Sequence, residues 1–78
     1  MPKFYFHLRQ GKDLIEDPEG VELPDVAAAH EEAIGAAREI MADRVKVGKV
    51  VNGEEFVICG EAGQPIATIP FKAALHLE

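Results

Sequence analysis

The segment from Asp25 to Val47, DVAAAHEEAIGAAREIMADRVKV, is the one stretch of this sequence with the period of a long helix. On a helical wheel its apolar residues fall on one side and its charged residues on the other, as in a helix that packs on a core through one face. The apolar side holds Val26, Ala33, Ala37, Ile40 and Met41, with Ala29 and Ile34 at its margins. Because alanine has the highest helix propensity and little bulk, we predict a helix that lies close to its partner surface.

The residues at both ends of this segment favour the start and the stop of a helix. Asp25 can accept a hydrogen bond from an unpaired N–H of the first turn, and its charge suits the positive end of the helix dipole. Arg44 and Lys46 suit the negative end, and Gly48 can adopt the left-handed conformation that often follows a helix. Arg44 falls on the apolar side, so we expect its stem to pack while its guanidinium reaches past the edge of a sheet.

The segments on either side of the helix have the two-residue period of strands. In KFYFHLR, Phe4, Phe6 and Leu8 alternate with polar or aromatic residues, which predicts a central strand whose phenylalanine face meets the helix. Further strands are predicted at 14–16, 50–51, 55–59 and 65–71, with an extended run at 21–23. Turn signals separate them: Asp17-Pro18-Glu19-Gly20 fits a type I turn, and Asn52-Gly53 favours a tight hairpin.

These elements predict an α+β fold of two layers, in the order β-β-α-β-β. An antiparallel sheet of about four strands would carry the one long helix on one face. We expect residues 1–76 to form a single domain, since 78 residues suffice for one small core. The final Leu77-Glu78 resembles the remnant of a purification tag. Residues 72–76 could begin a helical turn or be frayed.

One helix can cover only one face of a sheet, so the opposite face needs its own explanation. Strand alternation predicts that this outer face carries Tyr5, His7, Val57, Cys59 and Ile69, with Arg9 next to His7. We expect the surface formed by Tyr5, His7, Arg9, Val57 and Cys59, or an edge strand, to contact another protein, first of all a second copy in a homodimer.

The charge of the chain argues against several partners. Fourteen acidic residues against eight basic ones give a formal charge of −6, and the basic residues do not cluster as nucleic-acid binding requires. No run approaches the roughly 20 apolar residues of a membrane span. The first residues lack a signal-peptide pattern and Cys59 is the single cysteine, so we expect a cytoplasmic protein.

The residues that could carry chemistry do not form a known motif. His7 and His30 lack the spacing of metal ligands, and the acids before the helix lack a calcium-loop pattern. Cys59 could pair with a histidine as a nucleophile, but a buried strand cysteine is the favoured interpretation. Gly60 and Gly63 do not make a phosphate loop. We expect no metal, no cofactor and no enzymatic activity.

Three segments carry a resemblance that covers nearly the whole chain. FYFHLRQGKDLIEDPEGVELPD, AAAHEEAIGAAREIMAD and FVICGEAGQPIATIPFKAAL together resemble the small bacterial proteins known as domain of unknown function 6894. The shared features are the aromatic strand Phe4 to His7, the turn Asp17 to Gly20, and Glu22 to Asp25. The chain is more distantly similar to HicB-type antitoxins, in its aromatic strand, its Pro-Asp approach and its Glu-Ala helix, but it has no appended DNA-binding segment. The first resemblance implies no catalytic residue.

Three functions stay open on the sequence. The leading hypothesis is a small non-enzymatic protein-interaction module that self-associates. The second is an antitoxin-like regulatory partner that masks a basic protein with its acidic surface. The third is a small-molecule binder that uses Tyr5, His7 and Arg9 on the outer face of the sheet.

Overall fold

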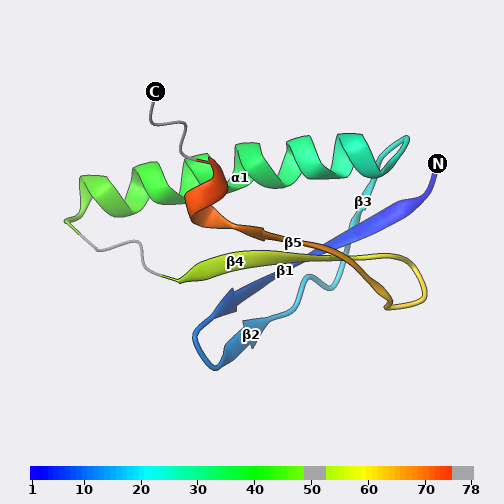
Figure 1. Ribbon diagram of the computed structural model, residues 1–78, viewed down its shortest axis with the longest axis horizontal. Helices are drawn as coiled ribbons and strands as arrows, with labels where there is room; N and C mark the ends of the chain where they lie inside the picture. The colour runs from blue at the N-terminus through cyan, green and yellow to red at the C-terminus, as the bar shows by residue number, and fades with distance from the viewer. Residues whose placement is uncertain (49–52, 75–78) are drawn as a thin grey trace.

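The computed structural model describes residues 1–48 and 53–74 and has the predicted α+β fold. In chain order the elements are β1 (Lys3–Gln10), β2 (Asp13–Ile15), β3 (Val21–Glu22), α1 (Val26–Lys46), β4 (Glu54–Cys59), β5 (Pro65–Pro70) and the single 3₁₀ turn η1 (Phe71–Ala74). The helix lies along one side of the sheet as a separate layer (Figure 1). The strand predicted at 50–51, Asn52 of the following turn, and the last residues 75–78 with the expected tag remnant fall outside the described residues.

The sheet is antiparallel throughout, with the order β2-β1-β4-β5, and β1 is central as predicted. It has five strands because the extended run before the helix also pairs with β1, through Lys3 with Glu22 and Phe4 with Val21. β2 and β3 therefore pair with the same edge of β1, one near each end. The turn at 16–20 separates them and interrupts the strand pairing along that edge.

The helix begins and ends where the sequence predicts. The Asp25 side chain accepts a hydrogen bond from the Ala28 N–H at 2.8 Å, and Gly48 follows the helix with φ +76°. Ala29, Ala33 and Ala37 are fully buried and Met41 is nearly so, while the charged residues of the opposite side are exposed. The predicted core of Phe4, Ala33 and Ala37 is therefore confirmed.

Val26 was placed on the buried side by the helical wheel, and this is wrong, because the structure leaves it 49% exposed. The buried residues Ala29, Ala33, Ala37 and Met41 follow one another at intervals of four. Four residues turn about 40° beyond a full turn, so the line of burial drifts around the helix along its length. A wheel averages over that drift and misplaces residues near the helix ends.

The residues of η1, which follow β5, pack between the helix and the sheet. Phe71 and Ala74 of η1 are buried, and the Phe71 ring lies 5.2 Å from the Phe56 ring, centroid to centroid. Arg38 Nε donates a hydrogen bond at 2.9 Å to the Ala74 carbonyl, so η1 is joined to α1 as well as to the sheet.

Ile69 was expected on the outer face, and the structure corrects this. Ile69 is opposite Phe56 in the ladder, and both side chains are buried in the core. The ladder between β4 and β5 is irregular at Ile58/Cys59, where Ile58 pairs with Ala67 but Cys59 pairs with Pro65. A bulge of this kind adds one residue to a strand and changes which residues share a face, which simple alternation cannot foresee.

Candidate functional site

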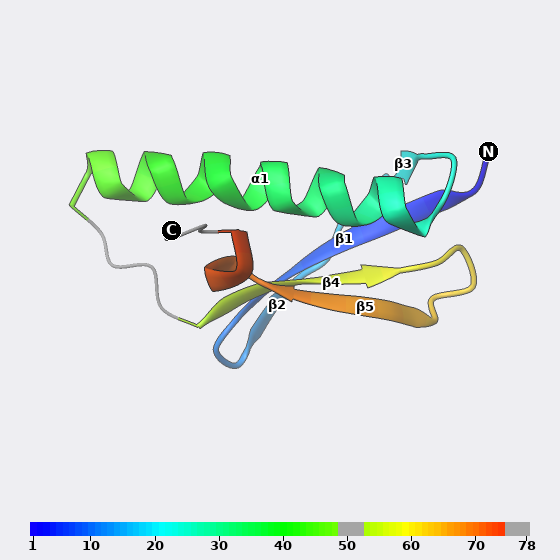
Figure 2. The same ribbon diagram turned by 45° about the horizontal axis from the view of Figure 1, so that its top comes forward.

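The outer face of the sheet brings together the five residues that the sequence singled out. Strand register places Tyr5 opposite Cys59, His7 opposite Val57, and Arg9 opposite Glu55. Residues directly opposite in a ladder share a face, so all of them lie on the side away from α1. Figure 2 shows α1 above the sheet. No described helix or strand covers the opposite side, where the turn at 16–20 contacts Tyr5 and His7.

Two of these five residues are buried although they face away from α1. Val57 is 8% exposed and Cys59 is 7% exposed, while Tyr5 and His7 are half-buried. Cys59 is a free thiol, as the favoured interpretation of a buried strand cysteine expects. The accessible part of this outer face is therefore Tyr5, His7 and Arg9, together with the exposed Thr68 of β5, which is opposite Val57.

Asp17 is the residue of this region that the sequence analysis missed. Its Oδ2 accepts a hydrogen bond from the Phe6 N–H of β1 at 3.1 Å, and its Oδ1 accepts from the N–H groups of Glu19 and Gly20 at 3.1 Å each. The carboxylate thus takes the place of a strand where the edge of β1 is interrupted between β2 and β3. The Asp-Pro-x-Gly pattern predicted the turn, but its bond to Phe6 depends on strand register.

The environment of Asp17 favours its charged form. Burial acts to raise the pKa of this carboxyl, but the hydrogen bonds from Phe6, Gly20 and Glu19, together with the nearby His7, outweigh it and lower the pKa below the ordinary value of 3.8.

His7 is held by the same turn. Its Nδ1 accepts a hydrogen bond from the Asp17 N–H at 3.0 Å, and its ring stacks on Tyr5 with centroids 6.4 Å apart and planes at 18°. An imidazole nitrogen that accepts a hydrogen bond carries no proton, so in this arrangement Nδ1 is unprotonated. His7 therefore acts here as a structural acceptor that fixes the turn against β1.

Two ion pairs join neighbouring elements of the fold. Arg9 pairs with Glu55 across β1 and β4 at 2.7 Å on the outer face. Arg44 was expected to reach past the sheet edge, but it pairs with Glu54, a buried residue at the start of β4. This pair joins the last turn of α1 to the sheet, and no local sequence pattern predicts the partner of Arg44.

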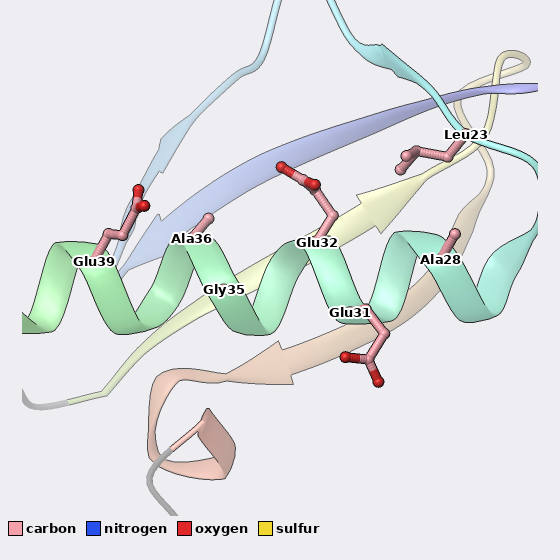
Figure 3. Close-up of a pocket in the computed structure, with 7 residues that line it drawn as sticks. All are labelled: Leu23, Ala28, Glu31, Glu32, Gly35, Ala36 and Glu39. Carbon is pink, nitrogen blue, oxygen red and sulfur yellow. The ribbon is translucent and has the colours of Figure 1, made fainter.

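A groove of about 640 Å³ follows the exposed side of α1, and it was not foreseen from the sequence. Its lining consists of Leu23, Ala28, Glu31, Glu32, Gly35, Ala36 and Glu39. Figure 3 shows Glu32 and Glu39 pointing to one side of the helix and Glu31 pointing to the other, with Gly35 between them. Ala28 and Ala36 point to the same side as Glu32 and Glu39, so the groove lies over the exposed surface of one helix, with Leu23 beside it.

The described residues contain no group of three or more His, Cys, Asp or Glu that could hold a metal ion. His30 is exposed on α1 and has no described acid or cysteine gathered with it as a metal site. Among the described residues, no helix combines the length and the apolar character of a membrane span.

The comparison with protein families agrees with the resemblance of the three sequence segments. No curated protein and no solved structure matches the chain significantly. The model of one family, Domain of unknown function (DUF6894), matches residues 3–72, which include every strand and the helix. The chain therefore belongs to the DUF6894 family.

Proposed function

We propose that this protein is a small non-enzymatic interaction module that self-associates through the outer face of its sheet. The observation that carries the proposal is the face itself, which presents Tyr5, His7 and Thr68 beside the buried Val57 with no described helix or strand over it. A sheet face of mixed aromatic and polar residues is a suitable surface for a protein contact.

The hydrogen bonds on this face favour binding over catalysis. The His7 Nδ1, both oxygens of Asp17 and the Arg9 guanidinium are each engaged within the fold. A general base or nucleophile needs a free lone pair directed at a substrate, and these groups direct theirs at backbone or at a neighbouring side chain. Their geometry supports a role in shaping the surface.

The edges of the sheet are less suited than the face to a contact between two copies. β5 begins and ends with proline, and β2 and β3 have three and two residues. Prolines and short strands prevent a second strand from adding to a sheet edge. Two copies would therefore pack face against face.

Sedimentation equilibrium and light scattering between 1 and 100 µM, roughly the range of weak to moderate dimers, test the proposal. The wild type is expected to form a dimer, and Thr68→Arg is expected to give a monomer of unchanged fold, because it adds an exposed charge to the face of each copy. Ala62→Arg in the exposed β4–β5 turn is the matched control and should leave the dimer intact. A wild type that stays monomeric throughout, or equal behaviour of the two arginine variants, would refute the proposal.

A further inference from the structure

The hydrogen bond that joins His7 to the turn at 16–20 depends on the protonation of the His7 ring. The Asp17 N–H donates to His7 Nδ1 at 3.0 Å, and this bond is part-buried. Once Nδ1 carries a proton it has no lone pair to offer, so the bond cannot form. We propose that His7 is a pH-sensitive switch: its neutral ring accepts from the Asp17 N–H, and its charged ring rotates to donate to the Asp17 carboxylate.

The Asp17 carboxylate can receive the charged ring. A carboxylate offers about four acceptor sites, and Asp17 uses three of them, for the N–H groups of Phe6, Glu19 and Gly20. Oδ1 accepts two of these bonds and Oδ2 accepts one, so Oδ2 has room for a further donor. Attraction between a charged His7 ring and this carboxylate is one of the causes that lower the pKa of Asp17. The neutral ring and the charged ring therefore each have a partner in the same turn.

His7 is the one side chain in its surroundings of a type that ordinarily changes charge between about pH 5 and pH 8. On the outer face its ionisable neighbours are Tyr5 and Arg9 of β1 and Glu55 and Cys59 of β4, and Arg9 and Glu55 pair with each other. The turn adds Asp17 and the exposed Glu16 and Glu19. Because the pKa of Asp17 is lowered from an ordinary value of 3.8, its carboxylate stays ionised and available across this interval.

Rotation of the His7 ring changes the outer face of the sheet, because the turn lies against that face. A Cβ added at Gly20 would lie 2.9 Å from the Tyr5 ring, so the turn cannot shift without changing its contact with that ring. The bond from the Phe6 N–H to Asp17 Oδ2 does not involve the His7 ring, so it holds the turn to β1 in both states. Protonation therefore moves the turn over Tyr5 without unfolding it, whether or not this face binds a second copy.

The test is NMR spectroscopy of the isotope-labelled full chain between about pH 8 and pH 5. At the alkaline end we expect a scalar coupling between the Asp17 amide nitrogen and His7 Nδ1, which requires an N–H···N hydrogen bond. On acidification the coupling should be lost and the Asp17 amide proton should move upfield, with the same midpoint as the His7 ring. The Phe6 amide should stay protected from exchange. A proton on Nδ1 at the alkaline end, or an Asp17 amide that does not follow the His7 titration, would overturn the proposal.

Two substitutions of His7 should hold the turn in one state each. His7→Asn places an amide oxygen close to the position of Nδ1 and does not titrate, so the Asp17 amide should keep its alkaline resonance throughout the interval. His7→Phe keeps a ring beside Tyr5 but has no acceptor, so the Asp17 amide should keep its acid resonance throughout. A wild-type pH response of the Asp17 amide in either variant would mean that another group drives it, and would overturn the proposal.

His30→Asn is the matched control, since it removes an exposed imidazole of α1 that lies on the other side of the sheet. It should show the wild-type response, and equal loss of the response in His30→Asn and His7→Asn would overturn the proposal. Thr68→Arg should also respond like the wild type. The switch and the self-association can therefore fail separately, because the coupling to Nδ1 is measured within one chain and the oligomeric state is measured by sedimentation.

Discussion

Replacement of the half-buried turn residue Asp17 by alanine is expected to destabilise this protein. The carboxylate accepts three backbone hydrogen bonds, from Phe6, Glu19 and Gly20. Hydrogen bonds to a charged group contribute about 1.5–3 kcal/mol each when buried and less where water can replace the partner. The bond to Phe6 is part-buried and not replaced by a strand, so we assign it about 1.5 kcal/mol, and about 0.5 kcal/mol to each turn bond.

The expected loss for Asp17→Ala is therefore about 2–3 kcal/mol. A domain of 78 residues has a total stability of about 4–12 kcal/mol, so the melting temperature should fall by roughly 10–20 °C. The amide of Phe6 should exchange with deuterium faster than in the wild type, because its acceptor is gone. Glu16→Ala, which removes an exposed acid from the same turn, is the control and should change the melting temperature by only a degree or two.

The same residue predicts a pH dependence. The pKa of Asp17 is lower in the folded protein than in the unfolded chain, so its ionised form stabilises the fold. This contribution is fully present above the unfolded pKa of about 3.9 and is lost as the pH falls through the lower folded value. The difference in stability between the wild type and Asp17→Asn should therefore be constant above about pH 5 and shrink below about pH 4.

An unchanged melting temperature in Asp17→Ala, with unchanged deuterium exchange at the Phe6 amide, would refute the role assigned to this carboxylate.

Three further changes test other parts of the fold by thermal unfolding. Gly20→Ala should destabilise the fold by about 1–3 kcal/mol, because Gly20 has φ +74° and a Cβ there would lie 2.9 Å from the Tyr5 ring. Gly11→Ala, where φ is +61° and a Cβ would meet open space, is the control and should destabilise it by about 1 kcal/mol. Equal losses of stability in the two variants would contradict the close approach of Gly20 to Tyr5. Arg44→Ala should destabilise by about 1–3 kcal/mol, since it removes the guanidinium that faces the buried Glu54, and an unchanged midpoint would contradict that pairing. Phe71→Ala should cost about 3–5 kcal/mol, and a loss below about 1 kcal/mol would mean that η1 does not belong to the core.

The sequence predicted the elements whose signals are local. Asp25, the alanine-rich stripe and Gly48 were enough to place α1 to within a residue, because capping and periodicity depend on neighbours in the chain. The alternation around Phe4 predicted β1 and the face that meets the helix for the same reason. The two-layer α+β fold follows from these elements, since one amphipathic helix and a set of short strands have few other ways to bury their apolar sides.

The tertiary structure decided what depends on register and on the angle between the layers. The bulge at Ile58/Cys59 put Ile69 into the core, and the drift of the buried line along α1 left Val26 exposed. The bonds of Asp17 to Phe6 and of Arg44 to Glu54 each join residues that no local pattern relates. Their positions follow from how the strands pair and how the helix crosses them, and those are properties of the whole packed chain.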